Sequence, residues 1–133
     1  MRASWDTIRL AISIAAISAC AFAPIASANA TTCGLASYYT EGARTANGER
    51  YRPDGMTAAH RTLSFGTILR VSYLGQVVSV RVNDRGPFIR GRILDLSRGS
   101  AKRLGMIGAG VARVCFTICR NWNFDQGECN ALE

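Results

Sequence analysis

Lysine, histidine and proline are scarce in this chain of 133 residues, and their scarcity narrows what the protein can be. Lys102 is the single lysine, so the formal net charge of +7 comes almost wholly from arginine. With only 3 prolines, the chain is 48% hydrophobic and 19% charged, which excludes a disordered tail, a collagen-like repeat and a coiled coil. No internal repeat is visible, and the length allows one domain.

Several signatures of catalysis and binding are also missing. The sequence has no glycine-rich phosphate loop, no Ser-His-Asp set and no Cys-x-x-Cys pair of the kind that holds zinc. We therefore expect no metal and no cofactor. The arginines are scattered rather than clustered, which argues against nucleic acid as a partner. An anionic surface or polymer outside the cytoplasm suits the basic charge better.

The first thirty residues follow the plan of a secretory signal peptide. Arg2 and Arg9 make the start positive, the stretch from Leu10 to Ala23 is apolar or small, and Ala28-Asn29-Ala30 is a small-x-small cleavage site. The apolar stretch is too short to span a bilayer, so we expect no transmembrane segment. In the alternative interpretation Ile17-Ser18-Ala19-Cys20 is a lipobox, and Cys20 carries a lipid anchor.

Removal of the first 30 of 133 residues leaves 103 residues with four cysteines. We expect the remaining residues to form a domain over residues 31–119 and a tail over residues 120–133. Export across the inner membrane places the protein in the periplasm or cell envelope, and soluble export is favoured over a lipoprotein. The sequence gives no indication of oligomeric state.

Period-2 patterns predict a mainly β fold. Apolar and polar residues alternate in stretches that predict strands over residues 34–39, 67–74, 77–82, 91–96 and 111–118, with a hairpin turn at Gly75-Gln76. One short helix is expected from Arg98 to Leu104, because Ser97 suits its N-cap and Gly105 its C′ position. Many short strands with one or two short helices indicate a compact β-barrel.

The last strand constrains the cysteines. Ala112, Val114, Phe116 and Ile118 share one face, predicted to be the core, and Cys115 and Cys119 share the other. Four residues along a strand span about 13 Å, too far for a Cys115–Cys119 disulfide. Two pairings remain open: either Cys33–Cys115 with Cys119–Cys129, or Cys33–Cys119 with Cys115–Cys129.

Four residues are candidates for catalysis. Asp84 follows a strand on a loop stiffened by Gly86-Pro87, where it is either a general acid or part of a surface ion pair. Asp95, in an apolar strand, is either a second acid or a cap for the following helix. His60 is the sole histidine, and Glu49 follows an Asn-Gly turn. Each of these two also has an ordinary structural interpretation.

An ordered set of motifs runs along the chain: Gly34-Leu35-Ala36-Ser37-Tyr38-Tyr39, Thr45-Ala46-Asn47-Gly48-Glu49, Thr57-Ala58-Ala59-His60-Arg61-Thr62-Leu63, Phe65-Gly66-Thr67, Val82-Asn83-Asp84-Arg85-Gly86-Pro87-Phe88 and Arg92-Ile93-Leu94-Asp95-Leu96-Ser97. In this order they resemble the bacterial rare lipoprotein A family, RlpA, from about Gly34 to Ile118. The resemblance implies a six-stranded double-psi β-barrel. It also implies endolytic lytic transglycosylase activity on the glycan strands of peptidoglycan, in the cell envelope.

The family's proposed active-site residues fall on Glu49, His60 and Asp84. Asp95 matches the position of the catalytic acid in more distant double-psi barrels. We expect Asp84 to be the general acid, kept protonated by partial burial and by a neighbouring carboxylate, Asp95 or Glu49, with His60 orienting it or binding sugar. The candidates for substrate binding are Tyr38, Tyr39, Asn83 and Arg85. The alternative function is an expansin-like glycan-binding module that uses the same groove without cleavage.

Many members of this family carry a further C-terminal domain that binds denuded glycan at the division septum. No such domain is expected in the sequence as given, and septal targeting is therefore not expected.

Overall fold

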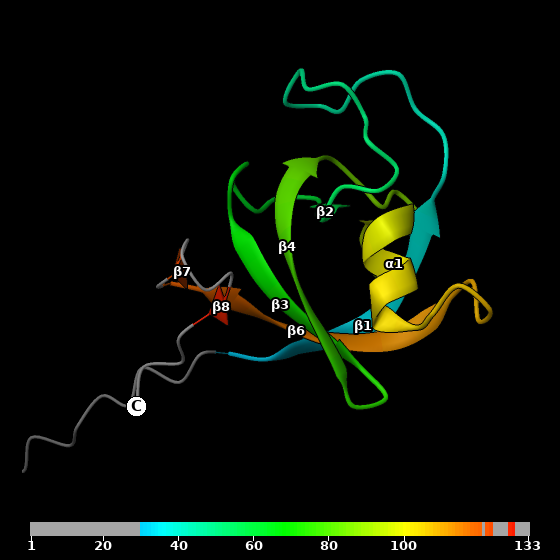
Figure 1. Ribbon diagram of the computed structural model, residues 1–133, viewed down its shortest axis with the longest axis vertical. Coiled ribbons are helices and arrows are strands. Elements are labelled where there is room, and N and C mark those ends of the chain that lie inside the picture. The colour runs from blue at the N-terminus through cyan, green and yellow to red at the C-terminus, as the bar shows by residue number, and fades with distance from the viewer. Residues whose placement is uncertain (1–29, 121, 124–127, 130–133) are drawn as a thin grey trace, which may run out of the picture.

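The computed structural model describes residues 30–120, 122–123 and 128–129 (Figure 1). Its main unit is a closed barrel with the strand order β1-β5-β2-β4-β3-β6. The six strands are β1 (Thr32–Tyr39), β2 (Thr57–Ala59), β3 (Ile68–Tyr73), β4 (Gln76–Asp84), β5 (Arg92–Ser97) and β6 (Ala112–Cys119). This closed barrel, with one short helix in the described part of the chain, confirms the expected fold class.

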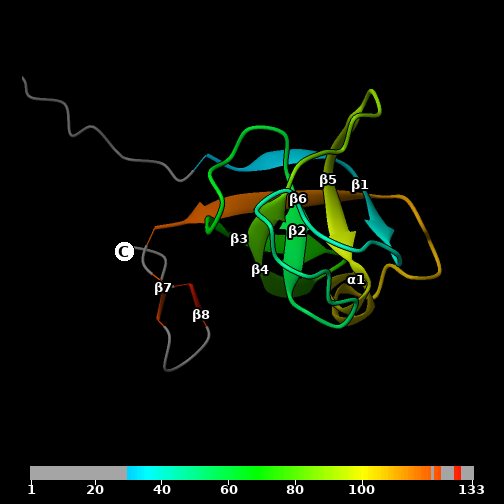
Figure 2. The same cartoon turned by 90° about the horizontal axis from the view of Figure 1, so that it is seen from above.

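Two strand pairs in the barrel are parallel, β1 with β5 and β2 with β4, and the other pairs are antiparallel. The short strand β2 therefore lies between β4 and β5, which are separated in sequence by a loop. In Figure 2 this loop between β4 and β5 projects beyond the strands. The arrangement brings the last residue of β4 and the middle of β5 to opposite sides of β2.

The core is built from the inward face of each strand. On β4, Val78, Val80 and Val82 are buried, and on β5, Leu94 and Leu96 are fully buried. Full burial of a side chain of this size stabilises the fold by about 2 kcal/mol. The residues that alternate with these valines on β4 face outward from the core.

The helix α1 (Arg98–Leu104) begins and ends where the sequence predicts. The Ser97 hydroxyl accepts a hydrogen bond from the Ser100 N–H at 3.2 Å and also donates to the Gly55 carbonyl. Gly105 adopts a left-handed conformation, with φ of 80°, and its N–H bonds the last turn of the helix. Ser97 thus caps α1 and at the same time ties it to the loop that precedes β2.

Two details differ from the sequence prediction. The tight turn of the β3–β4 hairpin is Leu74-Gly75 rather than the predicted Gly75-Gln76. Leu74 and Gly75 both adopt positive φ, and Gln76 already pairs with Tyr73. Ile118 is not in the core: it is 39% exposed. The pairing of β1 with β6 stops at Thr32 and Phe116, so β1 does not cover Ile118.

Two disulfides join Cys33 to Cys115 and Cys119 to Cys129, which is the first of the two pairings left open by the sequence. The second one ties the small hairpin of β7 (Trp122–Asn123) and β8 (Glu128–Cys129) to the end of β6. The predicted signal peptide up to residue 29, including Cys20, lies outside the described residues, as does much of the predicted tail. No helix in the described part is long and apolar enough to cross a membrane.

Candidate active site

Four strands place a row of residues across one end of the barrel. Asp95 of β5 pairs with Ser37 of β1 on one side and with Ala59 of β2 on the other, and Ala59 pairs in turn with Asp84 of β4. Two strand spacings separate the two aspartates, so their Cα atoms are about 10 Å apart. Thus two of the four predicted catalytic residues, Asp84 and Asp95, are brought to the same row.

Asp84 is half-buried and is held by backbone donors. Its Oδ1 accepts hydrogen bonds from the N–H groups of Ala46 at 2.9 Å and Arg85 at 2.8 Å. Because both donors bind one oxygen, the orientation of the carboxylate is fixed without an arginine or lysine partner.

Asp95 has a different environment. The Ser37 hydroxyl donates to its Oδ1 at 2.6 Å, and the Arg92 guanidinium lies 3.1 Å from the same oxygen. Asp95 therefore does not cap α1 as one interpretation of the sequence suggested, since Ser97 has that role. Sequence reasoning missed Ser37 and Arg92, although Arg92 stands three residues before Asp95.

The two tyrosines of β1 point to different places, as alternation requires. Tyr38 packs against the core and its hydroxyl donates to the Ile107 carbonyl at 3.3 Å. The pKa of Tyr39 is raised because its hydroxyl is removed from water and because the carboxylates of Asp84 and Asp95 oppose a phenolate. Tyr39 is thus a protonated hydroxyl facing the two aspartates, and it is the better placed of the two for binding a ligand.

Glu49 is an ionised anchor rather than an acid. Its carboxylate receives two hydrogen bonds from Arg81, at 2.7 and 2.8 Å, and one each from Asn47 and Asn83. The hydrogen bonds from Arg81, followed by those from the asparagines, lower its pKa to about 2. Glu49 therefore fastens its turn to β4, and the same turn carries the Ala46 N–H that binds Asp84.

This ion pair predicts a stability difference that depends on pH. The pKa of Glu49 is about 2 in the folded protein, against an unperturbed value of 4.5. Its contribution to stability is therefore complete above pH 4.5 and is lost as the pH falls towards 2. We expect Glu49→Gln to be less stable than the wild type above 4.5 and to converge with it in acid. Urea unfolding across this range measures the difference, with Glu41→Gln as the control. A constant difference at every pH would contradict this account.

His60 holds a loop. Its Nδ1 accepts hydrogen bonds from the N–H groups of Thr62 at 3.2 Å and Leu63 at 3.1 Å, and its ring packs edge-on against Phe116. Burial, with the charges of Arg85 and Arg61, lowers the pKa of this imidazole. His60 is therefore neutral near pH 7. Its main chain, rather than its ring, reaches Asp84, through an N–H that donates to the Asp84 carbonyl at 3.2 Å.

A neutral His60 that accepts two backbone bonds makes a second prediction. The pKa of His60 in the folded protein lies below the unperturbed value of 6.5. Its contribution to stability is therefore complete above pH 6.5 and is lost as the pH falls through the folded pKa. Chemical unfolding of the wild type is expected to show this loss just below 6.5. The loss should be smaller in His60→Asn, whose amide oxygen accepts hydrogen bonds but does not titrate. Equal losses in both proteins would show that His60 is not the responsible group.

Asn83 and Arg85, the other predicted binding residues, are engaged within the protein. The Arg85 guanidinium donates to the carbonyls of His60 and Leu63 and lies 3.9 Å from the ring centre of Phe65. Asn83 is buried and donates to Glu49. Both therefore position the loops on either side of Asp84.

Three buried polar atoms near the aspartates make no hydrogen bond within the described part of the protein: Tyr39 Oη, Asn83 Oδ1 and Arg92 Nε. An unpaired buried polar atom costs about 1–3 kcal/mol, so most such atoms in proteins have a partner. Unpaired buried polar atoms of this kind are available to a polar ligand. No group of three or more histidine, cysteine or acidic residues in the described ranges is arranged to hold a metal ion.

Comparison with known proteins assigns the chain to a family. The family model described as lytic transglycolase matches residues 31–116, and the chain belongs to this family. The chain is 57% identical over 88 residues to a probable endolytic peptidoglycan transglycosylase RlpA from Nostoc sp., and 49% identical over 89 residues to the Campylobacter jejuni RlpA. These matches cover 61% and 63% of this chain but only 24% and 32% of the relatives. The chain thus spans a quarter to a third of their length.

Solved structures share the barrel. A Clavibacter michiganensis expansin in complex with cellohexaose is 25% identical, with a TM-score of 0.57, over 68% of this chain and 51% of the expansin. The Streptomyces papain inhibitor is 23% identical, with a TM-score of 0.59, over 68% of this chain and 96% of the inhibitor, and this likeness shows the fold alone.

Proposed function

We propose that the protein is an endolytic lytic transglycosylase that cleaves the bond from N-acetylmuramic acid to N-acetylglucosamine in peptidoglycan glycan strands. The observation that carries the proposal is the pair of aspartates, Asp84 and Asp95, held in different environments on either side of Ala59. Cleavage of a glycosidic bond requires a proton for the leaving oxygen and support for a positively charged transition state. Two carboxylates with separate roles meet these requirements.

In the proposed reaction Asp84 acts first as the acid and then as the base. It donates its proton to the glycosidic oxygen as the bond from that oxygen to C1 of the muramic acid breaks. The 6-hydroxyl of the same sugar then attacks C1 and gives its proton to the Asp84 carboxylate, which forms a 1,6-anhydro ring. The proton balance closes without water, and Asp84 is restored to its starting state.

Asp95 has the second role. Its ion pair with Arg92 and its hydrogen bond from Ser37 support an ionised carboxylate, suited to stabilising the positive charge that develops at C1. Tyr39 Oη, Asn83 Oδ1 and Arg92 Nε are available for hydroxyl and acetamido groups of the sugars. Glu49, His60 and Arg85 position the loops that carry Asp84.

A glycan-binding module that does not cleave is the second candidate, because an expansin of similar fold is in complex with an oligosaccharide. Under either function we propose an exported protein of the periplasm or cell envelope, with residues 1–30 as signal peptide, a barrel domain over 31–119 and a tail from 120.

Product analysis separates the two functions. The protein is incubated with purified sacculi, both intact and stripped of peptide stems, and the soluble products are examined by mass spectrometry. The proposal predicts fragments with anhydromuramic ends, each one water lighter than a hydrolysis product. Ordinary reducing ends would indicate a hydrolase. Binding to sacculi with no release of fragments would favour the binding module.

A further inference from the structure

The loop between β4 and β5 has an exposed apolar tip. Phe88 is 84% exposed and its neighbour Ile89 is 55% exposed, on the segment that projects beyond the strands in Figure 2. Side chains as exposed as these add little to the core. A single exposed apolar residue needs no explanation, but adjacent ones beside a polar site are typical of a surface that binds a ligand.

Arg61 holds this loop in one shape. Its guanidinium donates three hydrogen bonds to main-chain carbonyls of the loop: Nε to Pro87 at 2.7 Å, and Nη2 to Ile89 at 3.1 Å and to Arg92 at 2.7 Å. The Arg92 N–H also donates to the Ile89 carbonyl at 3.3 Å, which closes a turn. One side chain thus binds the loop at three points, and Phe88 stands on a fixed support, which lowers the cost of ordering it when a ligand binds.

The Phe88 ring lies close to one of the two aspartates. A Cβ atom on Gly86 would lie 3.6 Å from Cε2 of the Phe88 ring and 3.9 Å from Oδ2 of Asp95. These two atoms are therefore at most 7.5 Å apart, the sum of the two distances. Gly86 has a φ of 123°, which favours glycine, so this residue puts no side chain between the ring and the carboxylate. A sugar with its C1 beside Asp95 is within reach of the ring.

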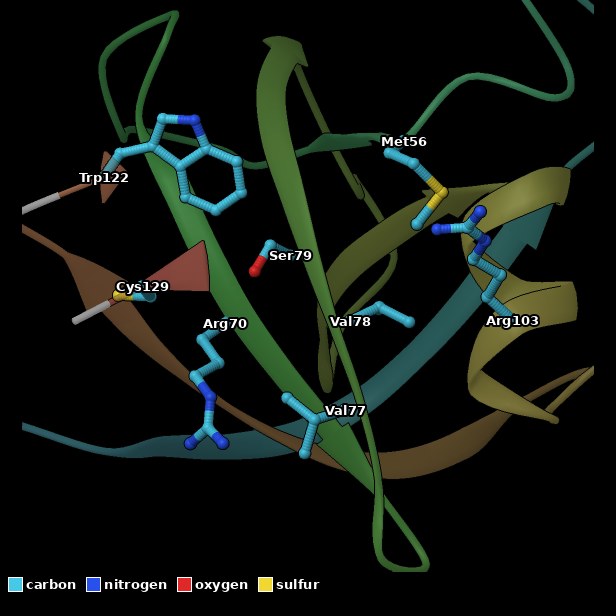
Figure 3. Close-up of a pocket in the computed structure, with 8 residues that line it drawn as sticks. All are labelled: Met56, Arg70, Val77, Val78, Ser79, Arg103, Trp122 and Cys129. Carbon is cyan, nitrogen blue, oxygen red and sulfur yellow. The ribbon is translucent and has the colours of Figure 1, made fainter. Parts of the chain in front are cut away.

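A separate cavity of about 610 Å³ lies on the outer face of β4, between α1 and the hairpin of β7 and β8 (Figure 3). Its lining includes Arg70, Val77 and Trp122 but none of the predicted catalytic residues. The tip of the β4–β5 loop, which reaches Asp95, is therefore the better placed of the two surfaces to contact a sugar at the cleavage point.

We infer, resting on the proposed function, that Phe88 is a stacking platform for a sugar ring of the glycan strand, next to the bond that is cleaved. The axial C–H groups of a pyranose make a face of the sugar apolar, and the negative face of an aromatic ring attracts them. Ile89 extends this apolar surface. Tyr39 Oη and Arg92 Nε, unpaired within the described part of the chain, are available to the polar edge of the sugar. The surface thus matches both the apolar face and the polar edge of a sugar.

Calorimetric titration with soluble glycan strands stripped of peptide stems tests this inference. The background is Asp84→Asn, in which the strands should stay uncut. Adding Phe88→Ala should weaken binding about tenfold and leave the melting temperature unchanged, because the ring is exposed. Phe88→Trp should bind normally, whereas Phe88→Leu, which is apolar without an aromatic face, should bind nearly as weakly as Phe88→Ala. The matched control is Leu74→Ala, 85% exposed in the hairpin at the opposite end of β4, which should bind normally.

Arg61→Gln tests the support of the ring. It should weaken binding when Phe88 is present and have little further effect in Phe88→Ala, because the loop then has no ring to present. Equal losses in the two backgrounds would overturn the role of Arg61 as a positioning residue for Phe88.

Two further results would overturn the platform. One is unchanged binding in Phe88→Ala with binding lost in Arg70→Gln, which would place the strand in the cavity of Figure 3. The other is a self-associated protein that Phe88→Ala converts to a monomer, which would make the tip an interface between copies of the chain.

The proposed function fails separately from the platform. Release of anhydromuramic fragments by the wild type, with normal binding in Phe88→Ala, would keep the enzyme and refute the platform. Weakened binding in Phe88→Ala, with no release of fragments by the wild type, would refute the enzyme and keep the platform.

Discussion

Asp84→Asn is expected to reduce glycan cleavage by about 10²–10⁴-fold, the usual contribution of a general acid and base. The amide removes the proton that the leaving oxygen needs but keeps an oxygen at Oδ1. That oxygen still accepts the hydrogen bonds from Ala46 and Arg85, so the fold should be retained. The rate of release of anhydromuramic fragments measures the effect, and the melting temperature checks the fold.

Asp95→Asn is the matched comparison. It removes a charge that supports the transition state but leaves the acid in place, so a smaller loss, of about tenfold to a hundredfold, is expected. Full activity in Asp84→Asn together with an inactive Asp95→Asn would exchange the two assignments. Full activity in both variants would remove the aspartate pair from the mechanism.

Loss of the Cys33–Cys115 disulfide is expected to lower the free energy of unfolding by about 4 kcal/mol, since it joins residues 82 apart in sequence. That is a large fraction of the roughly 5–15 kcal/mol that stabilises a typical domain. The two cysteines stand opposite each other on β1 and β6, so the bond holds two strands of the closed barrel together. Denaturant unfolding of the double variant Cys33→Ala/Cys115→Ala measures the loss.

The second disulfide supplies the control. Cys119 and Cys129 are 10 residues apart in sequence and hold a hairpin rather than two barrel strands, so Cys119→Ala/Cys129→Ala should cost less, under about 3 kcal/mol. A larger loss in this variant than in Cys33→Ala/Cys115→Ala would show that the hairpin, and not the β1–β6 pair, limits stability.

Local patterns in the sequence were sufficient for much of the fold. The cap at Ser97 and the glycine at 105 define α1 because both act within one turn of the helix. Alternation along β6 correctly separates inward from outward residues until Ile118, where the face continues but the pairing with β1 has ended. That error shows the limit of a periodic pattern, which indicates a face and not what covers it.

The site was less accessible to sequence reasoning. Asp84 and Asp95 stood out as carboxylates at a strand end and within an apolar strand. Their juxtaposition depends on β2 lying between β4 and β5, which local patterns do not specify.

The partners of the candidate residues also come from distant segments. Arg81 reaches Glu49 across 32 residues, and Ser37 reaches Asp95 across 58. The resemblance predicts catalytic roles for His60 and Glu49. In the structure the His60 ring accepts two backbone hydrogen bonds and the Glu49 carboxylate pairs with Arg81, contacts that the local sequence does not indicate.

In the proposed reaction a hydroxyl of the sugar itself, and not water, attacks the anomeric carbon. The most direct test is digestion of sacculi by the wild-type protein in water enriched in a heavy oxygen isotope, followed by mass spectrometry of the released fragments. Anhydromuramic ends that carry none of the label are expected. Reducing ends that carry the heavy isotope would contradict the proposed reaction, because they require a water positioned beside Asp84 or Asp95.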